Sequence, residues 1–141
     1  NDRQQAAHLL SQLGLPDLSK AYPDQLSGGQ QSRVALARAL IVRPSVLFMD
    51  EPFAALDALT REELQCDFSN LCRAQGISVL FVTHDIGEAV FLGDRVSLIE
   101  SGSLRPALPI GLPRPRATAL RHAPEFNALC ADLRHALQGA H

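Results

Sequence analysis

Apolar residues recur at helical spacing along the first part of the chain, and glycine or proline closes each such stretch. The pattern predicts a helix over 5–13 that Gly14 and Pro16 end. A turn-rich connection follows. A longer helix then begins at Ser27, a favourable N-cap residue, and stops before Pro44. The positions predicted to be buried on this helix are Val34, Leu36, Ala37, Leu40 and Ile41.

Shorter apolar runs alternate with further helices in the middle of the chain. Strands are expected over 45–49, 77–83 and 95–100, and helices over 60–75 and 85–92. The first two strand runs are almost continuously apolar, which is typical of strands covered on both faces. Gly76 is placed for a left-handed helix cap, and Gly93 ends the second helix. Strands and helices in this alternation predict an α/β fold with a parallel sheet and right-handed crossovers.

The composition changes at Leu104, where prolines become frequent. Residues 104–116 are predicted to form an extended, proline-rich linker. The last segment, 117–141, is predicted to be a helical tail with a break at Pro124. Its apolar residues lie on one face, so the tail is expected to pack on the sheet domain or on a partner. These residues are Phe126, Leu129, Leu133 and Leu137.

Composition and charge narrow the classes of function. The formal net charge of −2 gives no electrostatic case for binding nucleic acid or an anionic membrane. No apolar stretch approaches the roughly 18 residues of a membrane span. The cysteines Cys66, Cys72 and Cys130 lack paired metal-ligand spacing and are expected to be reduced thiols. Because the chain opens at Asn1 and its only methionine is Met49, a fragment of a longer protein is expected.

Two glycines follow the N-cap serine at the start of the long helix. Gly28 and Gly29 place bare backbone N–H groups at a helix N-terminus, where unsatisfied donors and the helix dipole both favour an anion. Ser27 adds a hydroxyl donor and Gln30 adds an amide. Taken alone, a Ser-Gly-Gly sequence fits an ordinary glycine-rich helix start better than an anion site.

Two adjacent carboxylates, Asp50 and Glu51, follow an apolar strand at the edge where open α/β sheets bind their ligands. One carboxylate there can hold Mg²⁺, largely through water, and the other can act as a general base toward an attacking water. A solvated acidic loop is the alternative. His84 follows the next strand, although a lone histidine is weak evidence. The other histidines, His8, His122, His135 and His141, are interpreted as surface residues.

Several of these residues together resemble the motifs of the ATP-binding cassette (ABC) ATPases. Residues 26–30 (LSGGQ) are similar to the signature motif, and 46–52 (VLFMDEP) to the Walker B motif. Ala54-Ala55-Leu56-Asp57 resembles the D-loop, and His84 resembles the switch histidine. The resemblance implies that Asp50 holds Mg²⁺, that Glu51 is the catalytic base and that His84 contacts the γ-phosphate. It also implies that Ser27, Gly28, Gly29, Gln30 and Asp57 act across a dimer on ATP held by the second subunit.

The nucleotide-cradling Walker A loop of that family has no counterpart in these 141 residues. The loop requires Gly-x-x-x-x-Gly-Lys-Ser/Thr, and the only lysine is Lys20. The resemblance therefore implies the C-terminal portion of a P-loop ATPase domain, with a helical subdomain, a parallel sheet and a C-terminal helical tail. The expected division is a partial ATPase domain over 1–103, made of a helical subdomain (1–43) and a distal catalytic core (44–103), followed by the linker and the tail.

Three phrases narrow the resemblance to one branch of the family: 51–61 (EPFAALDALTR), 80–96 (LFVTHDIGEAVFLGDRV) and 112–116 (LPRPR). They are similar to the ATP-binding subunits of bacterial nitrate, sulfonate and taurine importers. This implies an ATP-hydrolysing subunit on the cytoplasmic face of the inner membrane, paired with a second copy and with transmembrane permease subunits.

Two residues depart from the pattern of that branch. Gly87 replaces the usual acidic residue, and Ser32 is a second, milder departure. Because glycine in a helix interior costs about 1 kcal/mol relative to alanine, the helix after His84 is expected to be looser.

Two other interpretations stay open. Because the chain lacks the phosphate cradle, it can be a catalytically inert or interaction-only module by itself. A soluble ABC protein of translation or DNA repair is the third interpretation. Long coiled-coil insertions, a second cassette or a basic linker would mark such a protein, and the sequence has none of them.

Overall fold

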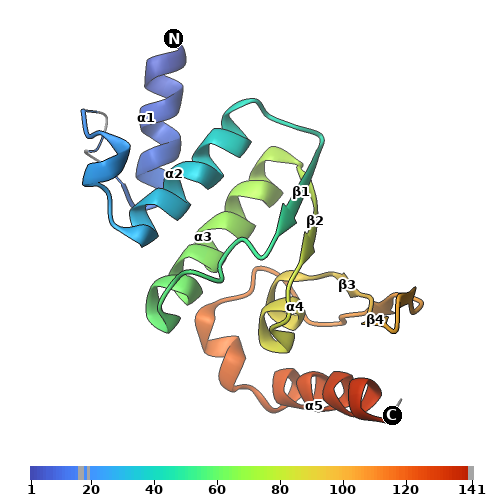
Figure 1. Ribbon diagram of the computed structural model, residues 1–141. Helices are drawn as coiled ribbons and strands as arrows, with labels where there is room; N and C mark the ends of the chain where they lie inside the picture. Colours follow the sequence, from blue (N-terminus) through green and yellow to red (C-terminus); the bar gives the residue numbers. More distant parts are fainter. Residues whose placement is uncertain (16–17, 19, 140–141) are drawn as a thin grey trace. The chain divides into compact units, whose positions relative to one another are not determined.

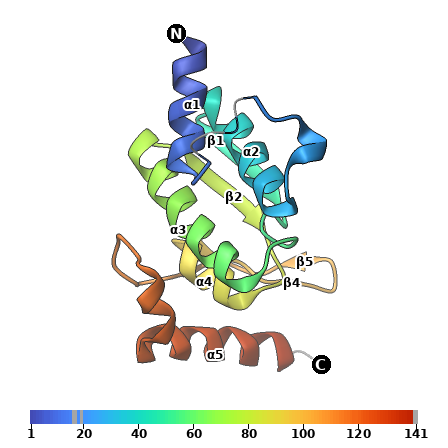
Figure 2. The ribbon, with the colours of Figure 1, turned by 90° about the vertical axis from the view of Figure 1, so that its left-hand side faces the viewer.

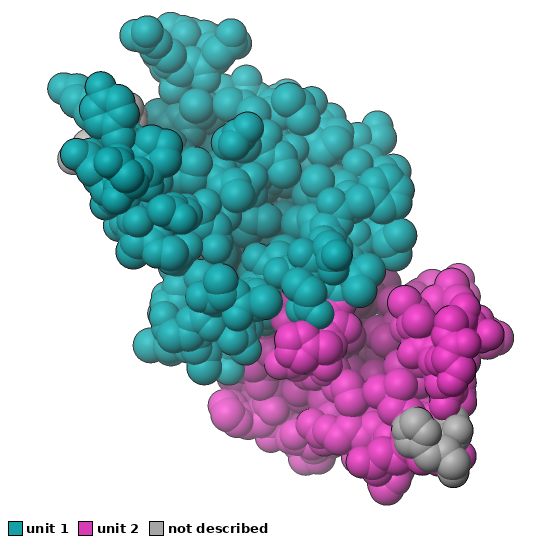
Figure 3. All heavy atoms as spheres, viewed as in Figure 1, with its two compact units in different colours: residues 1–82 teal, residues 83–141 magenta. Residues whose placement is uncertain are grey.

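The computed structural model describes residues 1–15, 18 and 20–139. The chain divides into two compact units, residues 1–82 (unit 1) and 83–141 (unit 2), which are coloured separately in Figure 3. Each unit is described by itself. The helix stop predicted at Pro16 and the surface position predicted for His141 lie outside the described residues.

Unit 1 consists of helices and one pair of parallel strands. Its elements are α1 (Asp2–Gln12), η1 (Pro23–Gln25), α2 (Gly28–Ile41), β1 (Val46–Asp50), α3 (Ala58–Gln75) and β2 (Ser78–Val82). Figures 1 and 2 show α2 and α3 side by side on one side of the strands, with α1 against α2. The core between these elements contains Leu13, Leu40, Leu64 and Phe53, and the Phe53 ring meets that of Phe68 edge-on with centroids 5.9 Å apart.

The helices of unit 1 begin where a side chain can satisfy their first N–H groups. The Asn1 side chain accepts a hydrogen bond from the N–H of Arg3, so α1 starts three residues earlier than predicted. The predicted cap of α2, Ser27, is confirmed, and Asp57 caps α3. Gly76 is confirmed as the left-handed cap of α3, with φ +67°.

Within unit 1, the β1–β2 sheet is covered on one face only, so the prediction of cover on both faces is wrong for this unit. The strands pair in parallel, with Phe48 opposite Leu80. Successive side chains point to opposite faces, and α2 and α3 cover only one face. Phe48 is 71% and Leu80 61% exposed, because none of the described residues of unit 1 covers the other face.

The predicted burial of α2 needs a smaller correction. Leu36, Ala37 and Leu40 are buried as expected, whereas Val34 and Ile41 are only half-buried. These two residues lie at the margins of the apolar stripe, where the packing of neighbouring helices ends.

Unit 2 carries antiparallel strands where the sequence predicted a third parallel strand over 95–100. Its elements are α4 (Ile86–Leu92), β3 (Arg95–Val96), β4 (Ile99–Glu100), β5 (Ser103–Leu104), β6 (Leu108–Pro109), η2 (Thr118–His122) and α5 (Pro124–Gln138). Among the described strands, β3 pairs only with β6 and β4 only with β5, both antiparallel. The antiparallel pairing of β4 with β5 has a local cause. Ser101 and Gly102 both have positive φ, 48° and 76°, which turns the chain back in a tight hairpin.

The proline-rich segment 104–116 is packed into unit 2 and is not an extended linker. It supplies β6, and Ile110, Leu112 and Arg116 in it are buried. The helical tail with its break at Pro124 is confirmed, and α5 packs against α4 through Phe126, Cys130 and Leu133. The predicted boundaries of the ATPase domain, linker and tail stay a prediction.

The cysteines are confirmed as thiols without disulfide bonds. Cys72 on α3 and Cys130 on α5 are buried, and burial raises the pKa of Cys72 to about 11. His8, His122 and His135 are exposed, as predicted. Among the described helices, none combines the length and the apolar character that crossing a membrane requires.

Candidate functional site

The N-terminus of α2 is fixed by a reciprocal capping box. Ser27 Oγ accepts from the N–H of Gln30 at 3.2 Å, and Gln30 Oε1 accepts from the N–H of Ser27 at 2.9 Å. Both side chains use an acceptor in this cap. The Ser27 hydroxyl proton and the Gln30 amide hydrogens therefore stay available as donors. The next two N–H groups, of Gly28 and Gly29, have no partner within a helix, so four donors gather at a positive helix end.

Residues further along α2 hold this end in place. Gln31 Nε2 donates to the carbonyls of Pro23 and Leu26 at 3.1 and 3.3 Å, which ties the preceding loop to the helix. Arg33 Nη1 donates to the carbonyl of Leu13 at 3.2 Å and links the end of α1 to α2. Ser32 bonds back to the carbonyl of Gly28, so this departure from the family pattern leaves the glycine end undisturbed.

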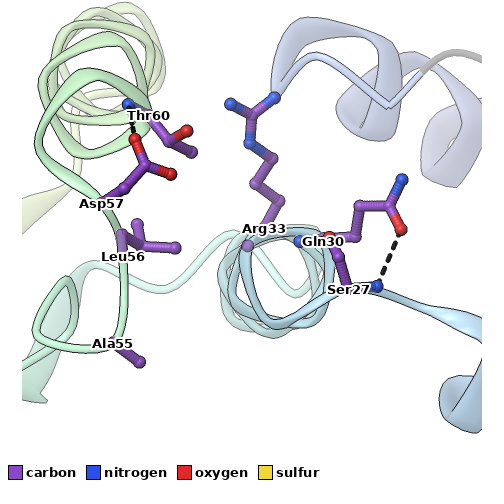
Figure 4. Close-up of a pocket in the computed structure, with 8 residues that line it drawn as sticks. Ser27, Gln30, Arg33, Ala55, Leu56, Asp57 and Thr60 are labelled. Carbon is purple, nitrogen blue, oxygen red and sulfur yellow. Dashed lines mark hydrogen bonds between the residues drawn. The ribbon is translucent and has the colours of Figure 1, made fainter.

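A pocket of about 310 Å³ opens between this helix end and the start of α3. Figure 4 shows Ser27, Gln30 and Arg33 on one side, with Asp57 and Thr60 on the other. The complete lining is Ser27, Gly29, Gln30, Arg33, Ala55, Leu56, Asp57 and Thr60. The structure therefore brings together four of the predicted site residues, Ser27, Gly29, Gln30 and Asp57. Gly28, Asp50, Glu51 and His84 are not among the lining residues.

Asp57 has two tasks in this pocket. Its carboxylate accepts from the N–H of Thr60 at 3.0 Å and caps α3. That hydrogen bond lowers the pKa of Asp57 below its ordinary value, so the pocket holds an anionic oxygen opposite the donors of α2. The backbone just before it is also held, because Arg61 Nη2 donates to the carbonyl of Leu56 at 2.7 Å.

Asp50 and Glu51 occupy the end of β1 in different conformations. Asp50 is the last strand residue and is exposed. Glu51 has a φ of +47°, a left-handed conformation that costs a non-glycine residue about 1–3 kcal/mol. It is held there because its N–H donates to Val82 at 2.8 Å and its carbonyl accepts from Ala54 at 3.3 Å. Strain of this kind clusters at active sites, which supports a role for Glu51.

The exposed carboxylate of Asp50 is of a kind that Mg²⁺ accepts as a ligand. The described residues contain no group of three histidine, cysteine, aspartate or glutamate side chains that could hold a metal ion. Mg²⁺ is usually bound by one or two carboxylates and keeps several waters. An exposed carboxylate at the end of a strand meets that requirement.

His84 belongs to unit 2 and lies two residues before α4. It is exposed, and the next residue, Asp85, is the N-cap of that helix. The Asp85 side chain accepts from the N–H of Glu88, and its own N–H donates to Thr83 Oγ1, both at 3.0 Å. Since Glu51 belongs to unit 1, the two residues are each placed within their own unit, and their shared role stays a prediction.

Sequence reasoning missed two lining residues, Arg33 and Thr60. Spacing offered a signal for both. Arg33 lies four residues after Gly29 and so on the same face of α2, and Thr60 lies three residues after the cap of α3.

The amino-acid sequence of this chain is similar to those of known proteins. Residues 1–54 match the family described as "ABC transporter". The aliphatic sulfonates import ATP-binding protein SsuB of Pseudomonas fluorescens is 53% identical over 116 residues, which are 82% of this chain and 43% of that protein. SsuB of Rhodopseudomonas palustris is 50% identical over 139 residues, covering 98% of this chain and 48% of the relative. This chain belongs to the ATP-binding proteins of ABC transporters. The resemblance inferred from the sequence is thereby confirmed.

Solved structures place the fold in the same family. An ABC transporter of metal-chelate type in an inward-facing conformation aligns with a TM-score of 0.69 at 27% identity, over 76% of this chain and 42% of that one. A dimeric ATP-binding cassette in a post-hydrolysis state with ADP and Pi aligns with a TM-score of 0.67 at 36% identity, over 77% and 47%. The predicted fold class, part of an α/β ABC ATPase domain, is confirmed. The ABC chain spans about half the length of the curated relatives it matches.

Proposed function

We propose that this ABC chain carries the signature, Walker B, D-loop and switch-histidine regions of an ATP-hydrolysing subunit that powers a bacterial importer. The pocket that joins Ser27, Gly29 and Gln30 to Asp57 supports the proposal most directly. It sets hydrogen-bond donors at a helix N-terminus, which suits a phosphate group. The 50–54% identity to aliphatic sulfonate import proteins favours an aliphatic sulfonate as the solute over nitrate.

The proposed reaction divides the work among residues of two subunits. Glu51 takes a proton from the attacking water, and His84 contacts the γ-phosphate. Asp50 would hold Mg²⁺, which supplies charge neutralisation on the phosphates when bound. Ser27, Gly28, Gly29 and Gln30 donate to the γ-phosphate held by a second copy, with Asp57 reaching across the same dimer. The proposed place is the cytoplasmic face of the inner membrane, against permease subunits.

The printed sequence also supports a second candidate, an inert module. These 141 residues contain no Gly-x-x-x-x-Gly-Lys-Ser/Thr pattern. The amides and lysine of that loop make most of the triphosphate contacts. The chain alone is therefore expected to show no shift in Tm with millimolar ATP, whereas Mg²⁺-dependent micromolar binding would contradict this.

The main test uses a fusion in which this chain replaces the matching part of the Pseudomonas fluorescens relative. In this fusion, Glu51→Gln should bind ATP normally, hydrolyse it at least about 10²-fold more slowly and accumulate as an ATP-bound dimer. Glu63→Gln is the matched control, because Glu63 is a glutamate on α3 that lies outside the pocket. Near-normal turnover by Glu51→Gln would show that Glu51 is not the base.

A further inference from the structure

Arginines from the segment 112–116 donate hydrogen bonds to the carbonyls at the C-terminal end of α4. A helix leaves its last four carbonyls without partners in the helix. In α4 the first of these, Ala89, accepts from the N–H of Gly93 at 2.9 Å. The other three, of Val90, Phe91 and Leu92, accept from arginine side chains. All four carbonyls at this end are therefore satisfied, three of them by guanidinium groups.

Arg116 is buried and donates most of these hydrogen bonds. Its Nη1 donates to the carbonyls of Val90, Phe91 and Gly93 at 3.1, 3.0 and 2.8 Å. Its Nη2 donates in another direction, to the carbonyl of Leu112 at 3.0 Å. The side chain is 6% exposed. The planar guanidinium of Arg116 thus joins α4 to the segment 112–116. A lysine ammonium group is a point charge and cannot reproduce this arrangement of hydrogen bonds.

A second arginine and a ring contact support the same helix. Arg114 donates to the carbonyl of Leu92 at 2.6 Å and to the Asp94 carboxylate at 2.9 Å. The Arg121 guanidinium stacks 3.9 Å from the centre of the Phe91 ring. Cationic groups at a helix C-terminus are also favoured by the helix dipole.

The helix depends on these contacts because it is weak by itself. It has seven residues, whereas isolated helices shorter than about 12–15 residues are marginal in water. Gly87 in its interior weakens it further. Its other end is capped by Asp85, which directly follows His84. Because α4 has only about two turns, holding its C-terminal end also holds the turn at its N-terminal end.

We propose that Arg116 is a positioning residue for His84: by holding the C-terminal carbonyls of α4, it fixes the turn that presents the histidine. The importance of this for turnover rests on the proposed function. Arg116 touches neither nucleotide nor water in this scheme, and it acts only through the helix.

The test compares Arg116→Lys with Arg134→Lys in the fusion protein, since Arg134 is an exposed arginine on α5. Amide hydrogen exchange of peptides from 83–93 should rise about tenfold in Arg116→Lys, while peptides from α2 stay unchanged. kcat should fall about tenfold with little change in KM for ATP. Arg134→Lys should match the parent in every measurement. Unchanged exchange over 83–93 would overturn the proposal.

A double-mutant cycle separates positioning from general stabilisation. If Arg116 acts through His84, then Arg116→Lys with His84→Ala should be no slower than His84→Ala alone. Fully additive losses, or a fall in Tm that accounts for the lost activity, would refute the positioning role. If His84→Ala leaves turnover unchanged, the proposed function of His84 fails. The exchange measurement then still decides whether Arg116 holds the turn.

Discussion

Replacing Gly29 with aspartate should separate the folding role of the α2 N-terminus from its role in hydrolysis. A Cβ added at Gly29 would lie 3.5 Å from Leu56 Cδ2 and 3.6 Å from Thr60 Cγ2, which is ordinary contact. Alanine therefore fits, and it should stabilise the helix by about 0.5–1 kcal/mol. A carboxylate in the first helical turn adds roughly 0.3–1 kcal/mol through the dipole. Both variants are expected to fold at least as stably as the parent.

For the aspartate variant, turnover should fall even though stability is kept. Its carboxylate would stand where the partner's γ-phosphate is proposed to bind. Two like unit charges about 4 Å apart repel by about 4 kcal/mol at an effective dielectric constant near 20. Since about 1.4 kcal/mol corresponds to a tenfold change in rate, kcat should fall on the order of 10²–10³-fold. Gly29→Ala adds no charge and should keep most of the activity.

The assay measures ATP hydrolysis, ATP binding and Tm for the three fusion proteins. Stability and activity falling together in both variants would show that Gly29 has only a packing role. Normal hydrolysis by Gly29→Asp would refute the phosphate assignment. Dimers with a single mutant subunit test the geometry further, because the lost activity should belong to the nucleotide of the unmutated subunit. A defect at the mutant's own nucleotide would contradict action across the dimer.

Two further predictions follow from the backbone and the caps. Glu51→Gly should be more stable than Glu51→Ala by about 1 kcal/mol in denaturant unfolding, because only glycine relieves the left-handed strain; equal stabilities would argue against strain at Glu51. Asp57→Ala should lower the Tm by a few degrees, while Asp57→Ser keeps the cap. Because the N–H of Thr60 lowers the pKa of Asp57 from 3.8, the ionised cap contributes fully above that value and its contribution is lost as the pH falls below it. A Tm difference between the parent and the Asp57→Ser variant that stays constant from pH 7 to about pH 2 would contradict this.

Features set by nearby residues could be predicted from the sequence, and those set by distant partners could not. Ser27 and Asp57 were identifiable as caps because each bonds an N–H three residues away. The pairing of β3 with β6 was missed because it joins segments separated by two hairpin strands. The exposed face bearing Phe48 was missed because an apolar strand does not reveal what covers it. Arg116 gave no local signal, since its partners on α4 lie more than twenty residues away.

The buried thiols give each unit a chemical reporter of its own opening. Cys72 lies in unit 1 and Cys130 in unit 2, and both are almost inaccessible. Burial raises both pKa values, so near neutral pH each group is overwhelmingly the unreactive thiol. An alkylating reagent can modify either cysteine at an appreciable rate only after its surroundings open. Mass spectrometry of the two modified cysteines would therefore time the opening of unit 1 separately from that of unit 2, without any engineered label.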